Sequence, residues 1–440
     1  VRVRGYEFVW DDKFFILQNP AVQNVSAVPD YFTDMDTMTE PSVAEVFRIY
    51  RPIRNLSYLV DFHLFGFNPG GWHLHNLLLH LVNGILIYSV ARQIRITRDG
   101  SLFAAAIFLL HPVQTEVVAW VKCRDDLLSV LFALASLVLL LKPVSIMVGG
   151  AFHWIACLAK AQSVIVLPVV TWFLPSVDRE VRWRNSLAFA VVSVLFLYLR
   201  HRVLGGTGQG DYLAGDIFST VFRMGPVLLS YVRLIIWPTQ QLADYAHLLD
   251  QPVSTSLLVS SWIGIVVIAV GLFWVAYRVP KIRIGVAWTL AAFLPVMNIV
   301  PMMQYMAERF LYMPMVGIAI AAGYVVSRLA EKSRLPTLCF SGLLVIMMSV
   351  QTHLRLPVWE NNLTLFSSVV RDASMESYRP LQNLLRAKIQ RGQLEQANTL
   401  LSELLQREWS RDQRAELLSD KGVLVAISGN PDQAIQYFTN

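Results

Sequence analysis

Two adjacent aspartates, Asp11 and Asp12, lie among aromatic residues in the stretch GYEFVWDDKFFILQNP, residues 5–20. A carboxylate beside apolar rings is poorly solvated, so its pKa rises and it can accept a proton near neutral pH. Successive side chains of an extended segment point in opposite directions, so one carboxylate can face a cavity while the other bonds the backbone or a basic residue. The alternative interpretation is a turn or a helix cap, where aspartate is common.

A second group of ionisable residues occurs in HPVQTEVVAWVKCRDDLLS, residues 111–129. Ionisable residues beside membrane spans are costly and often mark a function. The group contains His111, Glu116, Lys122, Arg124, Asp125 and Asp126. Two simpler interpretations stay open: Lys122 and Arg124 as anchors at the membrane boundary, and His111 with Pro112 as a helix break.

Four polar residues, His73, Asn76, His80 and Asn83, recur at steps of three and four and therefore share one helix face. They predict either hydrogen bonds between helices or a ligand or metal surface. The two histidines are seven residues apart, which disfavours a zinc site from this helix alone. We favour packing, with His73 as the exception because it lies nearest the outer face.

Basic residues at the expected outer surface suit a phosphate or pyrophosphate, because Lys and Arg pair with its oxygens. These are Lys160, Arg200, His201 and Arg202. Glu308 and Arg309 begin a span on the same side. The alternatives are lipid-headgroup contacts by long basic side chains and, for Glu308 with Arg309, a helix cap.

Membrane helices must position these residues. The 440-residue chain is 55% hydrophobic and only 15% charged, and its mean hydropathy is +0.48. Soluble domains have about 25% charged residues, so this composition indicates an integral membrane protein.

The net charge of the chain is only +6, and no nucleic-acid partner is expected. The three cysteines are far apart, which argues against a disulfide framework. Phosphate-loop, HExxH and nucleophile-elbow motifs are lacking.

A bilayer-spanning helix needs about 20 mostly apolar residues. The candidate spans are 73–93, 101–120, 126–142, 144–159, 162–175, 185–203, 256–277, 284–301, 309–327 and 335–355. Clusters of Arg and Lys between them predict the cytoplasmic loops, and these clusters agree with one another if 218–238 does not cross completely. Residues 1–72 then form a first outer loop with interfacial helices, residues 73–356 a bundle of about 10–11 spans, and residues 357–440 an outward-facing helical tail.

The tail repeats itself. RGQLEQANTLL (391–401) aligns with SGNPDQAIQYF (428–438), so that Gly392 and Gly429 are 37 residues apart, as are Ala397 and Ala434. A glycine that ends one helix and a small alanine in the next helix are typical of tetratricopeptide repeats, whose period is about 34 residues. The predicted fold class is therefore all-α: a polytopic membrane helical bundle with a C-terminal tetratricopeptide-like tail.

These motifs occur in a specific order: FVWDDKFFILQNP, YRPIRNLSYLVDFHLFGFNPGGWHLHNLLLHLVN, HPVQTEVVAWVKCRDDLLS, the Lys160 turn, AERFLYMPMVGI, WENNLTLF and the tail repeats. In this order the chain closely resembles the transmembrane and tetratricopeptide-repeat O-mannosyltransferases and their bacterial relatives, in the GT-C glycosyltransferase superfamily. Many relatives have Lys-Glu at the lysine turn, whereas this chain has Lys160 followed by Ala161 and Gln162. The family also places a span ahead of the first loop, so we expect one to precede Val1.

The resemblance implies a glycosyltransferase that moves mannose or a similar sugar from a polyprenyl- or dolichyl-phosphate carrier in the membrane to a protein hydroxyl. Asp11 or Asp12, with Asp12 favoured, would be the general base of an inverting single displacement. Lys160, Arg200, Arg202 and Arg309 would hold the leaving phosphate. The cavity and the acceptor site would use His73, His111, Glu116, Arg124, Asp125, Asp126 and Glu308.

A divalent cation near His111 and Glu116 is left open, and no other cofactor is expected. The tail would present the acceptor polypeptide, because concave helical arrays usually bind polypeptide. The expected location is the bacterial inner membrane with a periplasmic site, or alternatively the endoplasmic reticulum membrane with a lumenal site. A lipid or cell-envelope glycan acceptor, or a non-enzymatic membrane-anchored scaffold, are the competing functions.

Overall fold

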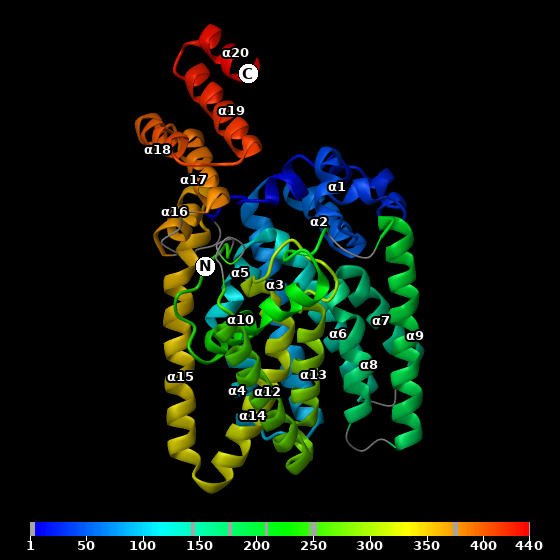
Figure 1. Ribbon diagram of the computed structural model, residues 1–440. Helices are drawn as coiled ribbons and strands as arrows, with labels where there is room; N and C mark the ends of the chain where they lie inside the picture. Colours follow the sequence, from blue (N-terminus) through cyan, green and yellow to red (C-terminus); the bar gives the residue numbers. More distant parts are fainter. Residues whose placement is uncertain are drawn as a thin grey trace. The chain divides into compact units, whose positions relative to one another are not determined.

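The computed structural model describes residues 5–141, 146–174, 178–206, 210–245, 248, 253–372 and 377–439. This part of the chain is helical and contains no strand, so the all-α prediction is confirmed (Figure 1). The chain forms two compact units, which are described separately. The first comprises Val1–Gln241 and Val253–Leu356, and the second comprises Leu242–Pro252 and Pro357–Asn440.

Residues 5–68 fold into a packed series of short helices. They are η2 (Lys13–Leu17), η3 (Pro20–Gln23), η4 (Val25–Ala27), η5 (Asp30–Phe32), η6 (Met35–Met38), η7 (Pro41–Val43), α1 (Ala44–Phe47) and α2 (Pro52–Phe65). Asn19 and Asn24 each accept a backbone N–H two residues further on, at 3.0 Å, which favours a new turn at each position. Phe15, Ile16 and Val22 pack with Tyr58 and Trp72 in one apolar cluster, so this segment is a fixed lid rather than a loose loop.

Six helices in the described residues are long and apolar enough to cross a membrane, and they fit a multi-pass integral membrane protein. Four are α3 (Pro69–Gln93), α9 (Arg179–Leu204), α10 (Ile217–Ile236) and α12 (Thr255–Arg278). The other two are η14 (Glu308–Leu311) continued by α14 (Tyr312–Lys332), and α15 (Arg334–Arg355) continued by η15 (Leu356–Trp359). The segment 218–238, which we expected not to cross completely, is therefore a continuous helix of spanning length.

Other expected spans form shorter or broken helices. These are α4 (Arg98–Leu110), η8 (Pro112–Gln114), α5 (Thr115–Ala119), η9 (Val121–Cys123), α6 (Arg124–Leu140), α7 (Ile146–Ala159), η10 (Ala161–Ile165), α8 (Val166–Val170), η11 (Thr171–Phe173), η12 (Pro280–Ile282), α13 (Arg283–Phe293) and η13 (Leu294–Val296). The chain bends by 51° between α4 and the helices from Pro112 to Ala119. Pro112 causes this break, because it lacks an N–H and forces His111 into an extended conformation. Residues 142–145 and 175, where three expected spans begin or end, lie outside the described residues, and the total of 10–11 spans stays a prediction.

Small residues let α14 approach two neighbours closely. A Cβ atom on Gly323 would collide with the carbonyl oxygen of Gly100 in α4, and one on Gly317 would collide with that of Gly285 in α13. Such backbone contact between helices is the usual role of glycine in membrane proteins. The close packing fixes α14, and with it the turn that contains Arg309.

The polar face of α3 packs against α14, as we favoured from its spacing. The Tyr312 hydroxyl lies 2.9 Å from Nδ1 of His80 and 3.0 Å from Nδ2 of Asn83. Asn83 also donates to the carbonyl oxygen of Leu127 at 3.0 Å. These hydrogen bonds between helices tie α3 to α14 and α6.

In the second unit, the described residues from Asn362 onward form helices joined by short connections. They are α16 (Asn362–Asp372), α17 (Tyr378–Gln390), α18 (Leu394–Gln406), α19 (Arg411–Ile427) and α20 (Pro431–Thr439). Gly392 and Gly429 follow α17 and α19 with φ of 70° and 93°, a conformation that favours glycine. Ala397 and Ala434 are buried where α18 and α20 pack. The unit thus contains two helical hairpins at equivalent positions, as the repeat predicted, while their identity as tetratricopeptide repeats stays a prediction.

Candidate active site

The Asp12 carboxylate fastens the first segment to the 121–123 turn. Its Oδ2 accepts the N–H of Val9 at 3.0 Å, and its Oδ1 accepts the N–H of Lys122 at 2.8 Å. Trp10 lies between these anchors with φ of 54°, a strained value for a large residue. Two backbone donors on one buried carboxylate hold this strain and turn Asp11 in the other direction.

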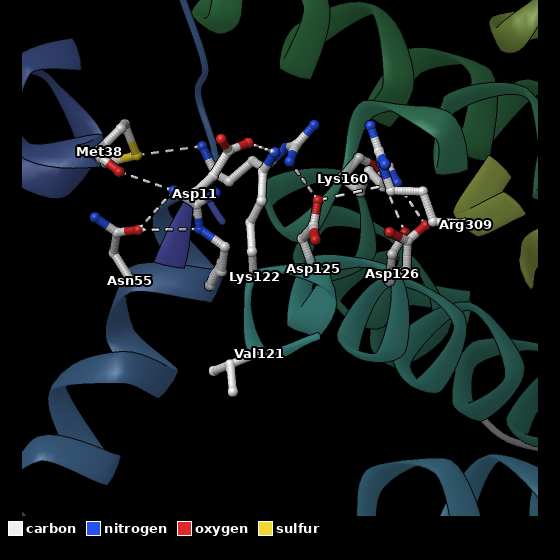
Figure 2. A network of polar contacts seen from close by, with 12 residues as sticks. Asp11, Met38, Asn55, Val121, Lys122, Asp125, Asp126, Lys160 and Arg309 are labelled. Atoms are coloured by element: carbon white, nitrogen blue, oxygen red, sulfur yellow. Dashed lines mark hydrogen bonds and ion pairs between the residues drawn. The ribbon is translucent and has the colours of Figure 1, made fainter. Parts of the chain in front are cut away.

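Asp11 therefore meets the side chain of Lys122 rather than its backbone. Lys122 Nζ lies 2.6 Å from Asp11 Oδ2. Figure 2 shows the two side chains facing each other. The Asp11 side chain is 16% exposed and that of Lys122 is 10% exposed, whereas Asp12 is fully buried. The neighbouring aspartates thus differ in access: the Asp11 carboxylate can meet another molecule, and the Asp12 carboxylate is enclosed.

Burial shifts the pKa values of Asp12 and Lys122. Desolvation raises the pKa of Asp12 from 3.8 to about 7, although the two backbone N–H groups oppose the shift. Burial also lowers the pKa of Lys122, against the attraction of Asp11. The predicted rise in pKa is therefore found at Asp12, and its cause is enclosure by the folded lid.

The Trp120 indole forms an aromatic wall beside Asp11. Trp10 stacks on it with ring centroids 4.9 Å apart and planes 7° from parallel. Lys122 Nζ and the Arg309 guanidinium lie 4.6 and 5.3 Å from the Trp120 ring centroid. Because cations are attracted to the face of an aromatic ring, the indole brings cations from two distant parts of the chain together.

The first turn of α6 holds two further carboxylates. Asp125 lies 2.5 Å from Arg51 and 3.9 Å from Lys160, and Asp126 lies 2.5 Å from Lys160. Both aspartates are 2% exposed and Lys160 is 7% exposed. Figure 2 shows Asp125, Asp126 and Lys160 together in this network. Carboxylates in the first turn of a helix suit its positive end, and here they also hold the cations of two other segments.

Glu116 and Arg309 form the fourth part of the cluster. Arg309 donates from Nη1 and from its backbone N–H to the two oxygens of Glu116, at 2.6 and 3.0 Å, and from Nη2 to Gln304 at 2.5 Å. Glu308 turns elsewhere and accepts from Gln241 at 2.8 Å. Four carboxylates thus pair with four cations: Asp11, Glu116, Asp125 and Asp126 with Lys122, Arg309, Arg51 and Lys160.

The remaining predicted residues are placed at the margins of this cluster or away from it. His73 is buried and lies 3.3 Å from the Glu7 carbonyl oxygen. His111 uses both ring nitrogens at the helix break, with Ile235 O at 3.0 Å and Val113 N at 3.3 Å. Half-buried Arg200 has Arg48 and Arg51 as electrostatic neighbours. Exposed Arg202 donates to Tyr198 of its own helix at 3.3 Å.

Two residues that the sequence reasoning left out of the site belong to it in the structure. Arg51 pairs with Asp125, and Asp61 pairs with Arg124. Both lie in YRPIRNLSYLVDFH, residues 50–63, where ionisable residues among apolar ones were the available signal. Among the residues that the structure describes, no group of three or more His, Cys, Asp or Glu side chains is arranged to hold a metal ion.

Fold and site together define a class: multi-pass helical membrane proteins with a buried, charge-paired acid–base cluster beneath a folded first segment. Comparisons with known proteins agree with the resemblance. The chain is 24% identical over 378 residues to a protein O-mannosyl-transferase of Caenorhabditis elegans, covering 83% of this chain and 54% of the relative. Human protein O-mannosyl-transferase TMTC3 is 23% identical over 425 residues, with 83% and 45% covered.

A shorter region is more similar. Human protein O-mannosyl-transferase TMTC4 is 34% identical over 149 residues, which cover 30% of this chain and 20% of the relative. The chain spans about half the length of the curated relatives that it matches most widely. No family model and no solved structure matches it. The resemblance to the transmembrane and tetratricopeptide-repeat O-mannosyltransferases is therefore confirmed by sequence relatives.

Proposed function

We propose that this chain is a GT-C glycosyltransferase that moves mannose or a similar hexose from a polyprenyl- or dolichyl-phosphate carrier to a Ser or Thr hydroxyl of a protein. The observation that carries the proposal is the Asp11–Lys122 pair, an accessible acid beside a cation, set among buried ion pairs. The names of the relatives support the transfer of mannose to protein. The six apolar helices support a donor that resides in the membrane.

Asp11 is the general base in this proposal, although Asp12 was favoured from the sequence. A base must come within hydrogen-bond reach of the acceptor hydroxyl, and geometry takes precedence over pKa. Both Asp12 oxygens already accept backbone N–H groups, and the residue is fully buried. Asp12 instead orients the strained Trp10–Asp11 segment.

The transfer is a single displacement. Asp11 takes the proton of the acceptor hydroxyl while the hydroxyl oxygen forms a bond to the anomeric carbon. The bond from that carbon to the carrier phosphate breaks, its electron pair leaves with the phosphate oxygen, and the anomeric configuration inverts. Because charge develops on the leaving phosphate, preorganised cations lower the barrier.

Lys122, Lys160 and Arg309 are the candidate cations of this cluster, and each is already paired with a carboxylate. Arg200 approaches the same cluster from α9 through Arg51. A phosphate that enters therefore competes with Asp11, Asp126 and Glu116 for these cations. Displacing Lys122 toward the phosphate would release the Asp11 carboxylate for the acceptor proton.

The other parts of the proposal follow the resemblance. The helical tail would present the acceptor polypeptide, and the site would face the periplasm or the lumen of the endoplasmic reticulum. Arg202 lies at the exposed end of α9, where it would meet lipid headgroups or the carrier phosphate. The divalent cation stays a prediction, and no step described above uses one.

The test is transfer of radiolabelled mannose from polyprenyl-phosphate mannose to Ser- and Thr-containing polypeptides by the full chain in nanodiscs. We expect Asp11→Asn to lower kcat by about 100-fold or more, because general-base catalysis contributes about 10²–10⁴-fold. Glu45→Gln is the matched control, because Glu45 is an exposed acid of the same segment.

Undiminished transfer by Asp11→Asn would refute the assignment of the base. Label found only in lipid or glycan would favour the second candidate acceptor class. No transfer with any donor would favour a membrane-anchored scaffold.

A further inference from the structure

Arg124 makes contacts that set it apart from the charged residues around it. It is fully buried, and each of its three guanidinium nitrogens has a different partner. Nη1 donates to Asp61 of α2, Nε to the Asn76 side chain of α3 at 2.8 Å, and Nη2 to the Trp72 carbonyl oxygen at 2.9 Å. Because the planar guanidinium offers donors in a rigid fork, three separate partners fix its position.

Asp61 is the charged partner on which this arrangement depends. It is fully buried, and its two oxygens are divided between Arg124 and Nδ1 of His75, which lies 2.5 Å away. The His75 side chain is 30% exposed, so only this end of the His75–Asp61–Arg124 row reaches the surface. A buried guanidinium without a carboxylate would carry an uncompensated charge, so Asp61 keeps Arg124 in place.

The same two helices hold the residues just before Arg124. Asn76 donates to the Trp120 carbonyl oxygen at 3.2 Å, and the Tyr58 hydroxyl lies 3.3 and 3.2 Å from the carbonyl oxygens of Val121 and Lys122. The backbone from 120 to 124 is thus fastened to α2 and α3 at successive positions. This backbone carries Lys122, the partner of the proposed base.

Arg124 also sets the direction of α6. Consecutive helical residues are turned by about 100°. When Arg124 points toward α2 and α3, Asp125 and Asp126 point toward Arg51 and Lys160, as the ion pairs show. A shift at Arg124 would therefore move Lys122 and both aspartates together.

We propose that Asp61 is a positioning residue of the transfer reaction: through Arg124 it fixes segment 120–126 and thereby the distance between the Asp11–Lys122 pair and the Lys160–Asp126 pair. This proposal rests on the proposed function, and in it Asp61 acts through Arg124 without contacting the substrate. A misplacement of about 1 Å costs on the order of 100-fold in rate, which sets the expected effect.

The experiment compares wild type with Asp61→Asn, Arg124→Gln and the double variant, each as the full chain in nanodiscs. We expect Asp61→Asn to lower kcat by about 100-fold while the KM for the acceptor polypeptide stays within about twofold. If Asp61 acts through Arg124, adding Asp61→Asn to Arg124→Gln lowers kcat little further, because coupled residues are not additive. Asp99→Asn is the control, since it removes an aspartate from an exposed pair with Arg334.

Amide hydrogen exchange gives a second readout that needs no substrate. We expect Asp61→Asn to speed exchange at residues 120–126 and to leave α12 and α14 unchanged, whereas Asp99→Asn leaves residues 120–126 as in wild type. Unchanged exchange at 120–126, unchanged kcat, or additive losses in the double variant would each overturn the proposal. If Asp61→Asn does not fold, the double variant, which lacks both the Asp61 and the Arg124 charge, takes its place. The proposal then requires that the double variant folds and shows the loss of kcat.

Failure of the proposed function is distinguishable from failure of this inference. If the wild type transfers no sugar, the enzymatic role falls for both, and exchange at 120–126 still shows whether Asp61 fastens the segment. If the wild type transfers sugar and Asp61→Asn is as fast, only the positioning role is refuted.

Discussion

Replacing Asp12 with asparagine tests whether enclosure by the lid governs the electrostatics of this site. The folded protein holds the Asp12 pKa at about 7, compared with an ordinary value of 3.8. Between these values the folded state binds a proton that the unfolded state has released. Stability from this group is therefore fully present below about pH 4 and is lost as the pH rises through 7. The shift corresponds to about 4 kcal/mol of unfolding free energy.

An asparagine side chain does not titrate, so Asp12→Asn should lack this pH dependence. Relative to the wild type, we expect the variant to gain about 4 kcal/mol between pH 4 and pH 8. The measurement is thermal unfolding of both proteins in the same detergent across this range, so that titrations of all other groups cancel in the difference. Asp36→Asn, at an exposed position of the same segment, controls for removal of a charge.

A difference between wild type and Asp12→Asn that does not change with pH would refute the reasoning, and so would one that increasingly favours the wild type as the pH rises. A difference that does not change with pH would mean that the two backbone N–H donors offset the cost of burying the charge. A difference that increasingly favours the wild type would mean that they outweigh this cost and that Asp12 is a stabilised anion.

Two further predictions concern the ion pairs and the helix packing. Glu116→Gln leaves the nearly buried Arg309 without its carboxylate, and we expect a loss of about 3–5 kcal/mol in unfolding free energy. Breaking the exposed Asp99–Arg334 pair should cost about 0–1 kcal/mol. Equal losses in the two variants would contradict the argument from burial. Gly323→Val places a branched side chain against the α4 backbone, which should separate α4 from α14 and cost about 1–3 kcal/mol or more. Thermal unfolding measures this loss, and Gly271→Val is the control because a Cβ atom added at Gly271 has no other atom within 4 Å.

Local features of the sequence were sufficient for the fold class and for the repeats. Hydrophobic runs of spanning length predicted membrane helices, and Gly392 and Gly429 predicted the two hairpins, because glycine tolerates the positive φ at a helix end. The aspartate pair among aromatic rings predicted a raised pKa, which the structure has at Asp12. Each of these inferences uses residues that are close together in the chain.

Only the tertiary structure decided how the charges are shared and which carboxylate is accessible. Asp11 meets Lys122, Glu116 meets Arg309 and Asp61 meets Arg124 across 111, 193 and 63 residues of sequence. No periodicity links such positions, and each partner is set by which helices pack together. The accessibility of Asp11 rather than Asp12 likewise depends on the path of the folded lid over the 121–123 turn. This path brings the backbone N–H groups of Val9 and Lys122 to the Asp12 carboxylate, which is buried between them.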